Sequence, residues 1–235
     1  MKLDPIRKFI RNLTGFDVHH HVPPRDRLAW LMSFNIQTVI DVGANEGQTA
    51  SEMRARFPQA DIYSFEPLPD CYSTLTRVMK GDTRFKSWNI GAGDNKTTTT
   101  IHRNPFSQSS SILDMEQLHR DTFPESRGDE QNVTIKIDRL DDVLKVSELK
   151  KNILFKIDVQ GYEDKAIRGS EQILRATKAV LIENSFMSLY KGQPLFADIY
   201  KMLVDLGFTY RGSLWQKLDP KTGAVMFEDS LFVRE

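Results

Sequence analysis

The chain has 235 residues, which corresponds to one large domain with short additions or to two small ones. Apolar residues make up 40% and charged residues 27%, which excludes wholesale disorder. The 32 basic residues balance the 32 acidic ones, so we expect no nucleic-acid partner held mainly by phosphate contacts. The longest apolar run, residues 28–32, is far too short to cross a membrane. The single cysteine, Cys71, allows no internal disulfide, and no apolar signal segment opens the chain, so we expect a cytoplasmic protein.

Residues 1–36 are predicted to form an N-terminal helical extension. Asp4 and Pro5 are typical of the start of a helix, and apolar residues follow at helical spacing up to Gly15. The helix is basic, so it can lie on a membrane surface, but its short apolar stripe favours packing on the main domain. The three histidines at 19–21 lack a second ligand cluster, which favours a linker over a metal site.

Residues 37–235 alternate between strand and helix patterns and are predicted to form one domain. Such alternation is typical of an α/β fold with a mostly parallel sheet and helices on both faces. The last two strands are predicted to form an antiparallel pair. The expected strands are 38–42, 61–65, 84–90, 97–102, 133–137, 153–157, 179–182, 209–216 and 230–233. The expected helices are 48–57, 69–79, 163–175 and 195–206.

A polar stretch, residues 103–132, interrupts this rhythm and contains three consecutive serines at 109–111. A loop of this length in a compact domain is usually functional or mobile, so we expect it to form part of the acceptor site. Four aromatic side chains could stack on a substrate or belong to the core. They are Phe106, Phe123, Phe186 and Tyr190.

The first strand ends in a glycine-containing turn, Asp41 to Gly47. Gly43 and Gly47 let the backbone approach a ligand at the start of the next helix. Their spacing is not the Gly-x-Gly-x-x-Gly of dinucleotide sites. Asp41 and Glu46 place negative charge where a pyrophosphate would lie, which favours a ligand with a positive centre. A plain tight turn is the alternative.

Glu66 ends the second strand, 19 residues after Gly47. An acid at this point is placed to accept hydrogen bonds from the hydroxyls of a ribose, although a solvated turn before proline is also compatible. After the third strand, the turn from Asn89 through Gly91 could border an adenine ring or be an ordinary turn.

Three acids follow the later strands. Asp158 directly follows the buried run 153–157, Glu163 begins the next helix, and Glu183 follows the run 179–182. Carboxylates held close together raise at least one pKa, which suits a general base. Glu163 could instead simply complement the helix dipole, and a divalent cation held by the three acids is a weaker alternative.

Five segments in this order resemble the FkbM-type family of S-adenosylmethionine-dependent methyltransferases. They are residues 39–49, 63–75, 155–170, 180–184 and 229–235. The segment around Asp158 is the most distinctive of the five. The resemblance implies a Rossmann-like class I fold with a seven-stranded sheet whose last strand is antiparallel. It also implies that Gly43, Asn45 and Gly47 border the methionine part of S-adenosylmethionine and Glu66 the ribose. Family members act on hydroxyls of sugars, glycans and polyketide-type natural products.

Cofactor-binding residues are predicted to be Asp41, Gly43, Asn45, Gly47, Glu66, Asn89, Gly91 and Asp158. Asp158 is the expected base, or the group that orients a small-molecule or glycan acceptor, assisted by Glu163 and Glu183; no metal is assigned.

Several alternatives stand beside this assignment. His102 and His119 are alternative bases, because histidine titrates near neutrality. A nicotinamide-dependent oxidoreductase and a non-catalytic cofactor- or partner-binding module are the competing functions. Cys71 as a nucleophile is less favoured than a packed thiol, because its neighbours on the predicted helix are apolar.

Overall fold

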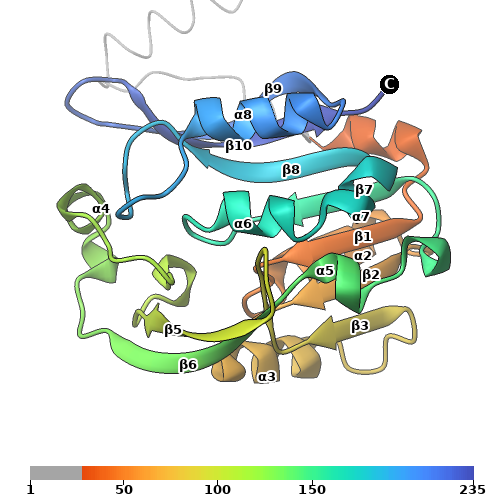
Figure 1. The fold of residues 1–235 in the computed structure, drawn as a ribbon, viewed down its shortest axis with the longest axis horizontal. Coiled ribbons are helices and arrows are strands. Elements are labelled where there is room, and N and C mark those ends of the chain that lie inside the picture. Colours follow the sequence, from red (N-terminus) through yellow and green to blue (C-terminus); the bar gives the residue numbers. More distant parts are fainter. Residues whose placement is uncertain (1–27) are drawn as a thin grey trace, which may run out of the picture.

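The computed structural model describes residues 28–235, and its centre is a seven-stranded sheet (Figure 1). The strand order is β3-β2-β1-β7-β8-β10-β9. The strands are β1 (Thr38–Val42), β2 (Asp61–Phe65), β3 (Phe85–Trp88), β7 (Ile153–Ile157), β8 (Thr177–Ser185), β9 (Thr209–Leu218) and β10 (Val225–Val233). Only β10 runs against its neighbours β8 and β9. The predicted α/β class, the mostly parallel sheet and the antiparallel C-terminal strand are confirmed.

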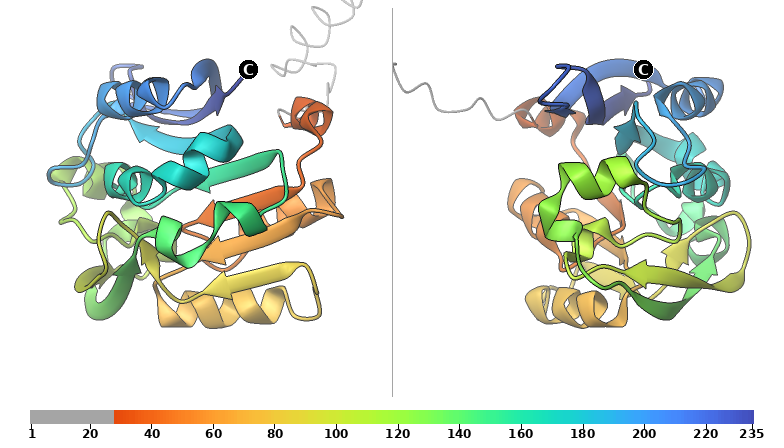
Figure 2. Two further views of the ribbon diagram at one scale, coloured as in Figure 1. Left: turned by 45° about the vertical axis from the view of Figure 1, so that its right-hand side comes forward. Right: turned by 90° about the vertical axis from the view of Figure 1, so that its left-hand side faces the viewer.

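Helices cover both faces of this sheet (Figure 2). One face buries Val39, Ile62 and Leu154 beneath α2 (Gln48–Arg56), α3 (Pro69–Val78) and the 3-10 helix η1 (Ala29–Phe34). The opposite face buries the alternate residues of the same strands. Its helices are α5 (Leu140–Val143), α6 (Glu163–Arg168), α7 (Glu171–Ala176) and α8 (Phe196–Asp205). Strands buried on both faces explain why the sequence shows continuous apolar runs there.

The predicted helix over 163–175 is wrong in one respect, because the structure contains two short helices, α6 and α7. The break lies at Gly169, whose backbone packs against the chain at Gly93. A Cβ at Gly169 would come within 1.8 Å of the Gly93 carbonyl oxygen. This approach belongs to the tertiary structure, so helical periodicity alone does not reveal it.

A second, three-stranded sheet contains the strands expected over 97–102 and 133–137. Its order is β4-β6-β5, from β4 (Gly91–Ala92), β5 (Thr97–Arg103) and β6 (Gln131–Asp138). Ile101 and Ile137 pack there against Leu68 and Cys71. The Cys71 thiol is buried, and burial raises its pKa to about 12. A thiol with so high a pKa stays protonated, so Cys71 is a packing residue and not a nucleophile.

The stretch 103–132 is not a plain loop. It contains η2 (Ser107–Ser109), α4 (Gln117–Thr122) and η3 (Pro124–Ser126) between β5 and β6. Its apolar side chains, among them Met115 and Phe123, pack against Tyr190 and Phe227. We call residues 103–132 the wall segment, because they close one side of the cavity described below.

The described part of the N-terminal extension packs on the domain. Leu31 of η1 is fully buried and joins Ile36 and Val39 in the core. The predicted helix after Asp4 and the histidines at 19–21 lie outside the described residues. Within residues 28–235, no helix is both long and apolar enough to span a bilayer.

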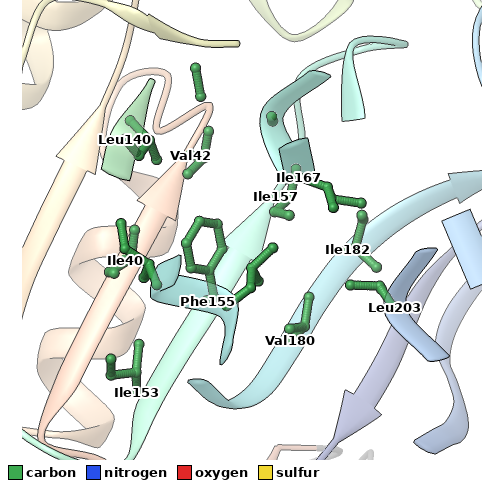
Figure 3. Close-up of a cluster of buried hydrophobic side chains, with 14 of the residues drawn as sticks. Ile40, Val42, Leu140, Ile153, Phe155, Ile157, Ile167, Val180, Ile182 and Leu203 are labelled. Atoms are coloured by element: carbon green, nitrogen blue, oxygen red, sulfur yellow. The ribbon is translucent and has the colours of Figure 1, made fainter. Parts of the chain in front are cut away.

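Phe155 provides a test of this core (Figure 3). Its ring is fully buried among Ile40, Ile153 and Val180. Phe155→Ala is expected to lower the free energy of unfolding by about 3–5 kcal/mol, because it deletes packed surface and leaves a cavity. Urea unfolding measures this change. The control Val204→Ala, at an exposed site on α8, is expected to stay within about 0.5 kcal/mol of wild type, and equal effects would contradict the assigned packing.

Candidate active site

A cavity of about 410 Å³ lies at the carboxyl ends of the central strands, a volume typical of ligand pockets. Ends of β1, β2, β7 and β8 form its floor, and the wall segment forms one side. The exposed rings of Phe106 and Trp215 also line it, as does Phe123. Phe186 does not line the cavity and stacks on Phe196 instead. Open parallel sheets bind ligands at this edge.

The glycine turn after β1 is held in a conformation that suits ligand contact. Gly43 has a φ of 78°, and a Cβ there would lie 1.8 Å from the Asp158 carbonyl oxygen. Only glycine fits this approach between the β1 and β7 turns. Asn45 also has a positive φ, 47°, and its side-chain oxygen accepts a hydrogen bond of 3.1 Å from Ser107 in the wall segment.

Glu66 lies next to this turn, with both carboxylate oxygens held by the backbone. Asn45 N–H donates to Oε2 and Leu68 N–H donates to Oε1, each at 2.8 Å. Burial nevertheless raises the pKa of Glu66 to about 7. The Asn89 amide donates to the carbonyls of Glu66 and Pro67, so it fixes the turn from behind. A carboxylate held in this way can accept hydrogen bonds from ligand hydroxyls.

Lys156 is a functional candidate that the sequence analysis missed. Its ammonium group donates to the Gly43 carbonyl at 2.9 Å and lies 3.5 Å from carboxylate oxygens of both Asp41 and Asp158. Burial alone would lower the pKa of Lys156, but the carboxylates of Asp158 and Asp41 outweigh it and raise that pKa. The ammonium therefore stays charged and neutralises part of the surrounding acid. The sequence does contain a sign of this role: Lys156 is a charged residue inside an otherwise apolar strand. In the sheet it lies opposite Asp41.

Asp158 and Glu183 are brought together by Gln160. The Gln160 side-chain nitrogen donates to Asp158 Oδ1 at 2.7 Å and to Glu183 Oε1 at 3.1 Å. Burial and the nearby charge of Asp158 raise the pKa of Glu183 well above its usual value. Asp229 pairs with Glu183 across β8 and β10, and burial raises its pKa to about 6. Asp158 and Glu183 thus face one cavity side by side, and paired carboxyl groups of this kind are suited to proton transfer.

Glu163 supports this group from outside the cavity lining. Its Oε1 accepts hydrogen bonds of 3.1 Å from the backbone N–H groups of Val159 and Gly161. Between them, Gln160 has a φ of 51°, which is uncommon for a residue other than glycine. Ser111 Oγ donates to the Gln160 carbonyl at 2.6 Å. Glu163 and Ser111 therefore hold the turn that carries Gln160.

The two histidines considered as bases differ in position. His119 lines the cavity and is nearly fully buried, and burial lowers its pKa to about 4. It is therefore neutral at pH 7, and its Nε2 lies 3.1 Å from the Tyr190 hydroxyl. His102 does not line the cavity and contacts Asn132 and Asp114. Tyr190 is buried and belongs to the site through hydrogen bonds, not as a stacking surface.

The structure divides the predicted site residues into two groups. Those that line the cavity are Gly43, Asn45, Glu66, Gly91, Asp158 and Glu183. Those outside its lining are Asp41, Gly47, Asn89 and Glu163. Gly47 faces α3, where a Cβ would lie 3.0 Å from Leu75, and Asp41 is fully buried beside Lys156. Within residues 28–235, no group of three or more metal-ligating side chains is arranged to hold a metal ion.

Known proteins that resemble this chain are named as methyltransferases. The chain is 26% identical to "Methyltransferase sdnD" of Sordaria araneosa, over 72% of this chain and 73% of that protein. It is 25% identical to "2-O-methyltransferase NoeI" of Sinorhizobium fredii, over 66% of each chain. The crystal structure of methyltransferase FkbM from Methylobacillus flagellatus matches with a TM-score of 0.54 at 15% identity. That match covers 85% of this chain and 44% of the other, and it supports the fold alone.

The model of the methyltransferase FkbM domain family matches residues 41–210. This range includes the glycine turn, Glu66 and the group formed by Asp158, Gln160 and Glu183. The resemblance inferred from the sequence is confirmed: the chain belongs to the FkbM methyltransferase domain family.

Proposed function

We propose that the protein is an S-adenosylmethionine-dependent O-methyltransferase that acts on a hydroxyl of a sugar, a glycan or a polyketide-type natural product. The observation that carries this proposal is the joint presence of Glu66 and the Asp158–Glu183 pair in one cavity. We further propose that residues 37–235 are the methyltransferase domain and residues 1–36 an extension. The protein named 2-O-methyltransferase among the relatives supports transfer to oxygen.

The residues around the glycine turn fit S-adenosylmethionine. Glu66 is a buried carboxylate aimed into the cavity, which suits ribose hydroxyls. Gly43 lets the β1 turn lie directly against the Asp158 backbone at the cavity, and the nearby acids favour a cationic ligand over a pyrophosphate. When bound, S-adenosylmethionine supplies an electrophilic methyl group on its sulfonium. Gly43, Asn45, Glu66 and Gly91 would hold it; Asp41, Gly47 and Asn89 would act by supporting their turns.

The acids at the ends of β7 and β8 are proposed to handle the acceptor. A hydroxyl must lose its proton as it is methylated, so a proton acceptor next to it lowers the barrier. Asp158 would orient the hydroxyl and accept this proton, with Glu183 beside it and Glu163 holding the turn. Phe106 and Trp215 supply exposed rings against which an acceptor could pack. The wall segment closes one side of the cavity and would reduce the access of water to it, which favours transfer to the acceptor.

Glu66 tests the cofactor assignment. Glu66→Gln is expected to weaken S-adenosylmethionine binding about 10- to 100-fold, because a charged acceptor held at the cavity is lost. Calorimetric titration measures this change, with NAD as the comparison ligand. Glu46→Gln is the matched control, since it removes an exposed acid of the same turn that does not line the cavity. Wild-type protein that is folded but binds no S-adenosylmethionine would contradict the proposal, and binding of NAD instead would indicate an oxidoreductase.

The raised pKa of Glu66 predicts that the affinity for S-adenosylmethionine depends on pH. Ligand hydroxyls need the ionised carboxylate, so affinity should be full above pH 7 and fall as the pH drops through about 7. Between pH 8 and pH 6 the ionised fraction falls about tenfold, and the affinity should fall by a similar factor. Glu66→Gln should not show this component, so the difference between the two titration series isolates it. Parallel curves for both proteins would show that Glu66 does not control binding.

Asp158 tests the proposed proton acceptor. Asp158→Asn keeps the size of the side chain, so S-adenosylmethionine affinity should change less than about twofold. Turnover should fall about 10²- to 10⁴-fold, the usual contribution of general base catalysis. Transfer of labelled methyl to a panel of sugar, glycan and polyketide acceptors measures it, with the exposed Asp205→Asn on α8 as the control. Unchanged turnover in Asp158→Asn would exclude this role.

A further inference from the structure

A chain of hydrogen-bonded side chains links the wall segment to the acids at the end of the sheet. His119 Nε2 lies 3.1 Å from the Tyr190 hydroxyl oxygen, which lies 2.8 Å from Gln160 Oε1. Gln160 then donates to Asp158 and Glu183. The chain therefore runs from α4, through the segment after β8, to the turn after β7.

The structure gives the direction of these hydrogen bonds. The NH₂ end of the Gln160 amide faces Asp158 and Glu183, whose side-chain oxygens accept from it. Its carbonyl end then faces Tyr190 and needs a donor, which the Tyr190 hydroxyl supplies. The Tyr190 oxygen in turn accepts from His119, whose neutral ring carries its hydrogen on Nε2 in this arrangement.

We propose that Tyr190 is a positioning residue, which with His119 orients the Gln160 amide so that its NH₂ group bridges Asp158 and Glu183. The proposal rests on the function proposed above, because it concerns the same two acids. The Tyr190 hydroxyl does not hydrogen-bond to either carboxylate; its partners are Gln160, His119 and the Ser109 carbonyl. It acts through Gln160 alone.

The bridge matters because Glu183 lies among other charges. Asp158 and Lys156 face it from β7 and its turn, Glu163 from α6 and Asp229 from β10. Three of these four are acids, and each of them favours the protonated form of Glu183. A donor held between Asp158 and Glu183 favours the ionised form, so it lets the two carboxylates lie close together. Without the Tyr190 hydroxyl, the Gln160 amide can rotate and this donor is no longer fixed.

The test is the titration of Glu183 in the free protein. Tyr190→Phe removes one oxygen and is expected to raise the pKa of Glu183 by about one, a tenfold change in proton affinity. Carbon-13 NMR of labelled glutamate carboxyls measures it, with the resonance assigned through Glu183→Gln. Gln160→Met removes the bridge itself and should raise that pKa at least as much. The double variant should equal Gln160→Met alone, because Tyr190 acts only through Gln160.

Tyr72→Phe is the matched control. It also removes a phenolic hydroxyl, a partly buried one that donates to the Ser87 carbonyl at 3.2 Å, but outside this chain of residues. It should leave the Glu183 titration unchanged. Thermal unfolding should show the Tyr190→Phe variant folded, and Gln160→Met tests the same bridge from the cavity side if the Tyr190→Phe variant disturbs the core.

The outcomes separate this proposal from the proposed function. An unchanged Glu183 titration in Tyr190→Phe, or additive effects in the double variant, overturns the positioning role while S-adenosylmethionine binding and methyl transfer remain. In the methyl-transfer assay, a shift of the acidic limb of the kcat profile to higher pH, by the same amount as the titration, supports it. A changed titration with no methyl transfer to any acceptor keeps the bridge but removes its proposed use in catalysis.

Discussion

The site depends on one buried ammonium group, that of Lys156. On the face of the sheet that it shares with Asp41 and Glu183, the strands are apolar toward their amino ends and charged toward their carboxyl ends. Burying carboxylates without a partner is costly, and removing one partner of a buried pair commonly costs about 3–5 kcal/mol. Lys156 contacts Asp41, Asp158 and the Gly43 carbonyl together, so it joins the β1 turn to the β7 turn. Asp41 can be fully buried there, with Asp158 and Glu183 close by, because this charge lies among the acids.

The cavity has two halves with different chemistry. The half near β1 and β2 consists of backbone turns and one carboxylate, Glu66, whose oxygens are fixed by two N–H groups. The half near β7 and β8 holds two acids joined by an amide. Gly43 lies at the meeting point, under the Asp158 carbonyl. A ligand bound to the first half thus lies beside the acids of the second, which is the arrangement that group transfer requires.

The second sheet and the wall segment give this cavity its remaining side. β5 and β6 carry the wall segment past the ends of the main strands, where Ser107 contacts Asn45 and Ser111 contacts Gln160. The wall therefore touches both halves of the site through short hydrogen bonds. Changes in this segment can alter the acceptor space without altering the sheet that holds Glu66 and Asp158.

The sequence by itself predicted the main sheet, most of the helices that cover it and six of the residues that line the cavity. Strands β1, β2 and β7 begin and end where their mainly apolar runs predict, since strands buried on both faces are rich in apolar residues. Glu66 and Asp158 were found because polar residues directly after such strands lie at the ligand-binding edge.

The tertiary structure decided what sequence spacing does not encode. The pairing of β5 with β6 joins residues 28 to 40 positions apart. Strand propensity does not specify which strands pair, so the second sheet was missed. Gly169 lies between α6 and α7, and its close approach to Gly93, far from it in the sequence, comes from the tertiary structure. Gln160, Tyr190 and His119 come from three separate segments, and only packing brings their polar atoms together. Hydrogen bonds between distant side chains depend on positions in space, which periodicity along the chain does not specify.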